Sequence, residues 1–472
     1  MRKLTGFFFL FFSVITLAQE SLFTLLDNSK TGIDFSNDLV DTKQHSIFLY
    51  ANYYGGAGVG IGDFDNDGLD DIFFAANLID DKIYKNLGNF QFEDKTEKSG
   101  IINNGSWSTG VTVADVNNDG LLDIYISCEL YDDAPILRKN KLYINKGNFK
   151  FEESAEKWGV DVDRRTRHSV FFDYNNDGLL DLYLLNHPPN TGNFSPFFGT
   201  DMTLPEYNLQ LFENKGDHFI DVTVAAGLDR AGFPNAAVIG DFNKDGWADI
   251  YVANDFDAPD FLYFNNQDGS FSYKTESSLR HTSFYSMGVD AADINNDSHL
   301  DLMVLDMTAE DNFRLKSNMS GMNPDSFWNV VKGGGHYQYM FNTMQLNNGN
   351  NTFSDVAQLT GTAATDWSWS SLVADFDNDG NKDIYITNGL LRDIRNTDAD
   401  KKISDIVSKK INEYIINNPD DTDISLWDVV DLQELLDIMP SQKLKNYYYK
   451  NDGNLEYSNI TENSGLNQPS FS

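Results

Sequence analysis

Oxygen-bearing side chains recur at positions one, three, five and nine of a nine-residue loop motif that occurs six times in this chain. The sixth position is glycine in five copies and Ser298 in the other. Hard oxygen donors at alternate positions of a tight turn are the ligands that Ca²⁺ prefers, and glycine tolerates the left-handed backbone that such a turn needs. We therefore predict a calcium ion in each loop, held by these side chains and by the carbonyl of position seven. The predicted ligands are Asp63, Asp65, Asp67 and Asp71; Asp115, Asn117, Asp119 and Asp123; Asp173, Asn175, Asp177 and Asp181; Asp241, Asn243, Asp245 and Asp249; Asp293, Asn295, Asp297 and Asp301; Asp375, Asp377, Asp379 and Asp383.

The six loops are not equivalent, so their predicted affinities differ. Loops one and six carry four aspartates at the ligand positions, and the other loops carry three. Ser298 of loop five has to adopt left-handed geometry, which costs a residue with a Cβ atom about 1 kcal/mol. We predict that loop five is the weakest site.

The residues around the loops predict strands. An EF-hand shares the Asp-x-[Asp/Asn]-x-[Asp/Asn]-Gly pattern, but it needs a glutamate at position twelve and a helix on each side. Position twelve is apolar here in every copy: Phe74, Ile126, Leu184, Val252, Val304 and Ile386. Each loop is followed by a short β-branched and aromatic run such as Ile250-Tyr-Val-Ala, which is typical of a strand. Each loop is therefore predicted to join the two strands of a hairpin.

A third and a fourth strand follow each hairpin in the predicted repeat. In the second copy they are Lys141-Leu-Tyr-Ile-Asn and, after a turn, Phe149-Lys-Phe, and the copy closes on Gly159-Val160. The first aspartates of successive loops lie 52 to 82 residues apart. Four-stranded units at such a period indicate a β-propeller. The predicted fold is all-β, a β-propeller with six complete four-stranded blades over residues 50–466.

These motifs resemble the FG-GAP/VCBS repeat proteins, a propeller group that is similar to the integrin α-subunit head. Gln338-Tyr-Met-Phe-Asn and Thr365-Asp-Trp-Ser-Trp resemble secreted bacterial proteins of the ASPIC/UnbV (cartilage-acidic-protein-like) type. The resemblance implies calcium as cofactor. It also implies seven blades and a C-terminal ASPIC/UnbV domain, so we interpret the chain as a fragment in which residues 467–472 begin a truncated seventh blade.

Charge and targeting signals place the protein outside the cell. The formal net charge of −37 argues against nucleic acid and anionic membrane surfaces as partners. Arg2 and Lys3 precede a short apolar run that ends in small residues near Ala18, which predicts a signal peptide over residues 1–18 and a secreted product without a transmembrane segment. Such a product could be extracellular, on the outer cell surface or periplasmic. Cys128 is the only cysteine, which excludes an intrachain disulfide.

Two segments outside the blade pattern have predicted roles. Residues 19–49 resemble the end of a blade and are predicted to close the propeller. Residues 390–445 form a predicted helical insertion in blade six, because Ile403, Ile406 and Val407 recur at helical spacing. A second helix is predicted from Leu426 to Met439. The insertion is interpreted either as helices packed on the rim or as a docking element for a partner.

An aromatic set suggests a ligand face. Trp107, Arg165, Phe233, Tyr285 and Trp367 each lie eight residues before a loop, so we expect them at one end of the channel with the calcium loops at the other. They should be partly exposed, with Arg167 and His168 adding a basic patch. The alternatives are packing between blades for the aromatic residues and a surface loop with local salt bridges for Arg164 to His168.

The sequence contains no Gly-x-Ser-x-Gly, His-Glu-x-x-His, Cys-x-x-Cys or phosphate-binding Gly-rich motif. The preferred hypothesis is a secreted calcium-binding propeller that binds a glycan or an extracellular protein and is not an enzyme. The alternative is a polysaccharide-active enzyme or subunit of the lyase type, which requires acids or bases at the channel mouth.

Overall fold

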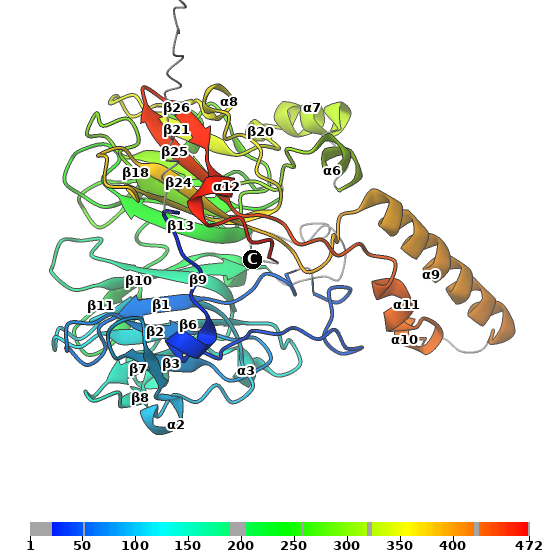
Figure 1. Cartoon of the computed structure of the whole chain (residues 1–472), viewed down its shortest axis with the longest axis horizontal. Helices are drawn as coiled ribbons and strands as arrows, with labels where there is room; N and C mark the ends of the chain where they lie inside the picture. Colours follow the sequence, from blue (N-terminus) through cyan, green and yellow to red (C-terminus); the bar gives the residue numbers. More distant parts are fainter. Residues whose placement is uncertain are drawn as a thin grey trace, which may run out of the picture.

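The computed structural model describes residues 21–50, 52–188, 204–256, 258–318, 323–419 and 424–470 (Figure 1). The predicted signal peptide, residues 1–18, lies outside this part. The described residues form six four-stranded antiparallel sheets, in agreement with the predicted repeat. Their strands are β1 (Val59–Gly62), β2 (Asp71–Phe74), β3 (Lys82–Asn86) and β4 (Phe92–Asp94) in sheet one; β5 (Trp107–Ala114), β6 (Asp123–Glu129), β7 (Lys141–Asn145) and β8 (Phe151–Glu153) in sheet two; β9 (Arg165–Phe172), β10 (Asp181–His187), β11 (Gln210–Asn214) and β12 (Phe219–Asp221) in sheet three; β13 (Pro234–Gly240), β14 (Asp249–Asn254), β15 (Phe261–Asn265) and β16 (Phe271–Tyr273) in sheet four; β18 (Val289–Ala292), β19 (Asp301–Val304), β21 (Thr343–Asn347) and β22 (Phe353–Asp355) in sheet five; β23 (Ser368–Ala374), β24 (Asp383–Asn388), β25 (Tyr447–Gly453) and β26 (Glu456–Asn459) in sheet six.

Sheets two to five each pack on a neighbouring sheet through both faces. Ile124 and Ile126 of β6 pack against sheet one, whereas Tyr125 between them packs against sheet three. Side chains alternate between the two faces of a strand, so a strand with a sheet on each side is apolar at every position. This explains why the second strands read as continuous apolar runs, and why β6 and β10 are buried along their whole length.

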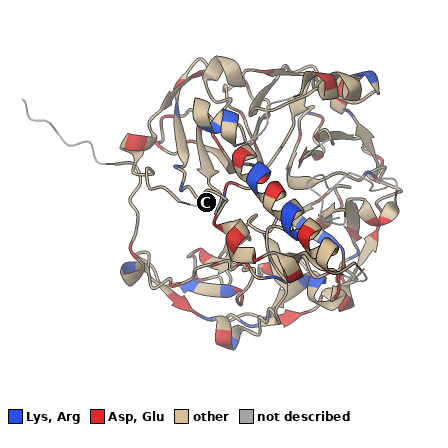
Figure 2. Cartoon of the chain, turned by 90° about the vertical axis from the view of Figure 1, so that its right-hand side faces the viewer, with Lys and Arg blue, Asp and Glu red and all other residues tan. Residues whose placement is uncertain are grey.

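The sheets follow one another around a common centre (Figure 2). The first strands contact in chain order, from β1 to β5, β9, β13, β18 and β23. An asparagine on the third strand links each sheet to the preceding one, because its Nδ2 donates to the carbonyl of loop position two. These bonds are Asn145 to Phe64, Asn214 to Val116, Asn265 to Tyr174, Asn347 to Phe242 and Asn451 to Ile294, at 2.7–3.2 Å. We refer to them as the asparagine latch.

The N-terminal segment connects sheet six with sheet one. The N–H of Phe23 donates to Ser464 O at 2.8 Å, and the Phe23 ring lies 5.9 Å from that of Phe376 beside sheet six. Beyond helix α1 (Asn28–Thr31), the ring of Phe35 stacks on Phe74 of sheet one at 4.7 Å. Residues 21–35 therefore bridge the last sheet and the first.

The remaining elements are short, apart from one long helix. Turns α2 (Thr96–Ser99), α4 (Ala155–Trp158), α5 (Thr275–Ser278), α8 (Ala357–Thr360) and α12 (Thr461–Ser464) follow fourth strands; the others are α3 (Pro135–Arg138), η1 (Pro205–Tyr207), α6 (Asn312–Ser317), α7 (Pro324–Lys332), α9 (Thr397–Asn417), α10 (Leu426–Val429), α11 (Leu432–Leu436) and the parallel pair β17 (Thr282–Ser283) and β20 (Gln338–Tyr339). Figure 2 shows α9 crossing the centre of the ring rather than lying on its rim. No helix in the described ranges is long and apolar enough to span a membrane.

Three sequence predictions need correction or detail. The predicted helix Leu426 to Met439 is two helices, because Val430 is extended and Asp431 caps a new helix start. The fourth strands predicted at Phe90 and Phe149 begin two residues later, because both phenylalanines have a positive φ in the preceding turn. Residues 467–470, predicted to begin a seventh blade, contain Ser470, which forms an isolated antiparallel bridge with Leu444.

Candidate metal loops and a candidate binding pocket

The six acidic loops share one backbone structure. The carboxylate of position one accepts the N–H groups of positions five and six at 2.7–3.1 Å in every loop. The carboxylate of position five accepts the N–H of position seven at 2.8–3.0 Å. These side chains fold the loop around themselves, so their oxygens point inward.

Two residues of each loop have left-handed backbone, at positions four and six. Sequence reasoning identified position six, where Ser298 has a φ of 69°. It missed position four, which is asparagine in five loops and Lys244 in the other. Among residues with a Cβ atom, asparagine adopts this conformation most readily. The repeated asparagine at position four could therefore have indicated the left-handed backbone.

The aspartate at position nine is fully or almost fully buried and connects the loop to the sheet. Asp249 is an example: its Oδ2 accepts the N–H of Phe242 at 3.0 Å and its Oδ1 accepts that of Asn265 at 2.8 Å. Burial raises the pKa of Asp249 to about 7, although these two N–H groups oppose the shift. Position nine is therefore a structural acceptor as well as a predicted metal ligand.

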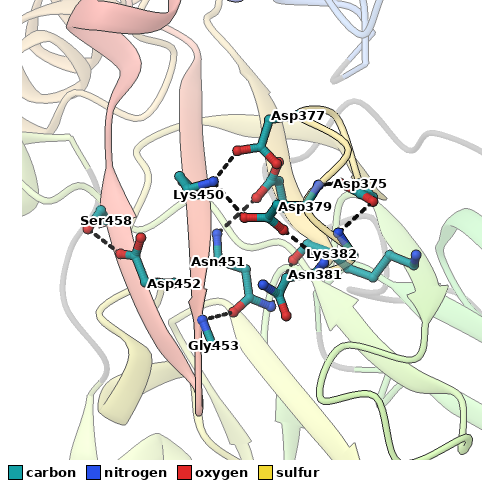
Figure 3. Close-up of polar contacts among 12 residues, drawn as sticks. Asp375, Asp377, Asp379, Asn381, Lys382, Lys450, Asn451, Asp452, Gly453 and Ser458 are labelled. Carbon is teal, nitrogen blue, oxygen red and sulfur yellow. Dashed lines mark hydrogen bonds and ion pairs between the residues drawn. The ribbon is translucent and has the colours of Figure 1, made fainter.

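Three acidic ligands converge in loop one and three in loop six. Carboxylate oxygens of Asp63, Asp65 and Asp71 all lie within 4.8 Å of one another. The same holds for Asp375, Asp377 and Asp379 (Figure 3), and Asp377 carries a buried Oδ1 without a hydrogen-bond partner. Clustered carboxylates with an unpaired buried oxygen are the donors that a hard divalent cation prefers.

The loops lie side by side on one face of the ring. The Nδ2 of Asn66 in loop one donates to Gly120 O of loop two at 2.9 Å, and Asn118 of loop two donates to Gly178 O of loop three at 3.3 Å. The predicted aromatic set lies at the other end of the first strands, because Trp107 begins β5 and loop two follows its last residue.

The aromatic residues gather only in part, and the expectation that they are exposed is wrong for three of the four. Trp107, Trp367 and Tyr285 belong to one cluster around the channel. Phe233 stacks on His187 at 4.1 Å. Trp107, Phe233 and Trp367 are buried, and only Tyr285 is half-buried. Trp107 packs against Tyr50 and Tyr53 of the segment that precedes β1, and Phe233 also contacts the ring of Phe256.

The basic segment from Arg164 to His168 is not a surface loop, because Arg165 begins β9. Arg165 is buried and pairs with Asp132, and Arg167 is buried and donates to Gly55 O at 2.6 Å. Burial, and then the charge of Arg167, lowers the pKa of His168 to about 4. These residues therefore do not form an exposed basic patch.

Sequence reasoning missed a buried charged network beside the channel mouth. His187 Nδ1 lies 3.3 Å from Glu129 Oε1 and 3.3 Å from Asn52 Nδ2. Burial favours protonation of Glu129, but His187 and Arg167 outweigh it and hold its pKa at about 2. The charge of Glu129 is therefore compensated inside the protein.

A pocket of about 640 Å³ lies on the face that carries α9. Its walls are mostly apolar, and they come from residues 47–55, the ends of strands and the helical insertion. The wall residues include Tyr54, Phe256, Met287, Met307, Trp369, Ile394, Ile403, Val407, Leu435 and Met439. Its polar residues are Asn52, Asp255, Arg395, Asp400, Ser404 and Ser408. Burial raises the pKa of Asp255 to about 7, and the N–H of Phe256 and the charge of Arg395 oppose this shift.

Three segments of the chain, residues 63–126, 241–304 and 324–386, match the model for FG-GAP-like repeats. The first segment runs from loop one through loop two, the second from loop four through loop five, and the third contains loop six alone. No curated protein matches the sequence.

Three solved structures are similar to this chain at low sequence identity and with TM-scores below 0.5. One is a lectin from Agrocybe aegerita described as recognising non-reducing terminal N-acetylglucosamine, with 16% identity, a TM-score of 0.43 and coverage of 85% of this chain and 78% of that chain. Rhamnogalacturonan lyase PL11 from Bacillus licheniformis has 11% identity, a TM-score of 0.37 and coverage of 71% and 55%. The V. cholerae biofilm matrix protein Bap1 has 13% identity, a TM-score of 0.31 and coverage of 59% and 34%. The likeness concerns the fold alone.

Proposed function

We propose that this protein is a secreted, calcium-stabilised propeller that binds a glycan or an extracellular protein through the pocket beneath α9. In this proposal the six sheets are blades, residues 21–35 close the ring, and cleavage near Ala18 releases the protein outside the cytoplasm. An ASPIC/UnbV-type origin belongs to the same proposal. N-terminal sequencing of the exported product tests the cleavage site, and retention of residues 1–18 would contradict it.

Calcium fits the donor set of the loops. The side chains of positions one, three, five and nine would hold it, and the ion would supply positive charge to carboxylates that otherwise repel one another. The protein's own contribution is a loop already folded by hydrogen bonds from positions one and five. Calcium therefore stabilises the scaffold, and ligand binding takes place on the opposite face.

The observation that carries the binding function is the pocket. Ligand sites are concave and mostly apolar, with a few polar groups that fix orientation. Tyr54, Phe256 and Trp369 offer aromatic surface for a sugar ring or an apolar side chain. Asn52 and Arg395 offer hydrogen bonds to hydroxyl, carbonyl or carboxylate groups.

Two substitutions on α9 test the pocket. Ile403→Lys places a charge in its wall, and Asp405→Lys on the same helix changes an exposed residue that does not line the pocket. On a glycan array and in binding assays with extracellular proteins, we expect Ile403→Lys to abolish the signal and Asp405→Lys to keep it. Equal binding by both variants would remove the pocket from the proposal.

A second candidate function, action on a polysaccharide, is favoured by Asp255. Its raised pKa of about 7 suits a general acid or base near neutral pH, and it lines the same pocket. If the protein is an enzyme, Asp255→Asn removes turnover of an acidic polysaccharide such as rhamnogalacturonan and preserves its binding. Absence of turnover by the native protein would leave binding as the function.

A further inference from the structure

The third strands beside loops one and six carry a lysine at a position where the other third strands do not. Lys85 of β3 and Lys450 of β25 occupy the same place on their third strands, one residue before Asn86 and Asn451. The equivalent residues in the other four sheets are Ile144, Glu213, Phe264 and Leu346. Loops one and six are also the two with aspartate instead of asparagine at position three. The additional acid and the lysine therefore occur together, twice, in one chain.

The lysine bridges the two carboxylates that this exchange brings together. Lys85 Nζ pairs with Asp65 and, at 2.7 Å, with Asp67. In Figure 3, Lys450 lies in the same way between Asp377 and Asp379. Both ammonium groups belong to mostly buried side chains, 20% and 28% exposed. A lysine that is held by two carboxylates and is mostly buried differs from a freely solvated surface charge.

The asparagine loops, which have asparagine at position three, show which contact the lysine replaces. In loops three, four and five, the Nδ2 of Asn175, Asn243 or Asn295 donates directly to the position-five carboxylate at 3.0 Å. An aspartate at position three lacks this N–H donor, and its negative charge repels the carboxylate at position five. The lysine restores the bridge and offsets the additional charge, so a lysine–aspartate pair is the ionic counterpart of one asparagine.

We propose that Lys85 and Lys450 are built-in counter-ions of loops one and six, which keep these loops folded without metal and reduce their affinity for a divalent cation to that of the asparagine loops. The first effect depends only on the chain. The second rests on the proposed calcium binding. It removes the difference in affinity that is expected from the four aspartates of loops one and six.

The test without metal is a double-mutant cycle in the full chain, with EDTA present. Lys85→Met leaves Asp65 and Asp67 unbridged and should lower the melting temperature. Asp65→Asn added to Lys85→Met should restore most of the loss, because it rebuilds an asparagine loop. Lys82→Met is the matched control: it lies on the same strand but pairs with Asp94 at 2.7 Å, and it should have little effect.

Recovery by the double variant separates a counter-ion from a side chain that merely packs, and it applies even if Lys85→Met alone does not fold. Equal melting temperatures for Lys85→Met and Lys82→Met, or no recovery in the double variant, would overturn the proposal. The same cycle with Lys450→Met and Asp377→Asn repeats the test in loop six.

The test with metal is calorimetric titration with Ca²⁺ alone. Removing one positive charge next to the predicted ligands should tighten binding at the altered loops about tenfold. We expect Lys85→Met/Lys450→Met to show a tighter class of two sites, and weaker or unchanged binding would overturn the second effect. If neither the native protein nor the variants bind calcium, the proposed calcium function fails, and the cycle in EDTA still decides the counter-ion role.

Discussion

The face with the acidic loops and the face with the pocket are built differently, although both lie at the ends of the same strands. Every loop repeats the same hydrogen bonds, from the position-one carboxylate to the N–H groups of positions five and six. The pocket has no such repetition: Tyr54, Phe256, Trp369 and Ile403 come from unrelated segments and a helical insertion. In this molecule, repetition accompanies the features that hold the sheets in place, and ligand specificity is expected where the repeat is interrupted.

The largest effect should come from removing calcium, which acts on the loop face alone. A site occupied at a hundred times its Kd contributes about 2.7 kcal/mol, and several sites act together. We expect chelation to lower the melting temperature by at least about 10 °C, with recovery on adding millimolar Ca²⁺. Differential scanning calorimetry with EDTA and with Ca²⁺ measures this, and superimposable curves would remove calcium from the stability of this face.

Removing one bond of the asparagine latch should give the next largest loss of stability. Two equivalent asparagines, one with and one without a bond between sheets, allow the comparison. Asn265 donates to Tyr174 O of the preceding sheet at 2.8 Å, whereas Asn86 of sheet one donates only to Asp70 O within its own sheet. Asn265→Ala leaves a buried carbonyl without its donor and should cost about 2–3 kcal/mol. Asn86→Ala should cost about 1 kcal/mol. Urea denaturation compares the two variants, and equal losses would mean that the bond between sheets adds nothing.

The same contrast explains what could be predicted from sequence. The hairpins, the third strands and the loops were predictable because six copies of Asp-x-[Asp/Asn]-x-Asp report the same environment. The pocket was not, since no local pattern links Tyr54 to Ile403. Equal spacing placed Trp107 and Trp367 at the correct end of their strands, but spacing along a strand does not say whether a distant segment, such as the one with Tyr50 and Tyr53, covers the side chain. The pair of Glu129 and His187 was not predicted, because the two side chains come together only when sheets two and three pack.

A medium-sized effect should appear in the pH dependence of stability, through the buried carboxyl of Asp260. Burial raises the pKa of Asp260 to about 7, against bonds from Tyr251 and Asn254, so the folded state holds a proton that the unfolded state releases near pH 4. This contribution to stability is complete below about pH 4 and is lost as pH rises through 7. With Ca²⁺ saturating, we expect the free energy of unfolding to fall between pH 5 and pH 8.

Asp260→Asn identifies the group responsible. The variant should show a smaller decline in unfolding free energy over this range, because the amide does not titrate. Asp268→Asn, which changes an exposed acid in the turn between β15 and β16, is the control and should keep the native slope. A slope in Asp260→Asn identical to that of the native protein would assign the pH dependence to other groups.

The smallest predicted effect concerns the one loop that departs from the repeat. Ser298 has a φ of 69°, and its N–H still donates to Asp293 at 2.8 Å, so loop five keeps the common geometry at a conformational cost. At Gly68, Gly120, Gly178, Gly246 and Gly380 an added Cβ would meet nothing within 4 Å, which indicates that the cost at this position is backbone strain and not collision.

Ser298→Gly removes a strain of about 1 kcal/mol, but the greater freedom of glycine in the unfolded chain offsets part of the gain. We expect a net gain of at most about 1 kcal/mol in EDTA, together with slightly tighter calcium binding in the weakest class of sites. Ser298→Ala is the matched control, because it removes the hydroxyl and keeps the Cβ. If the alanine variant gains as much as the glycine variant, the hydroxyl and not the left-handed backbone sets loop five apart.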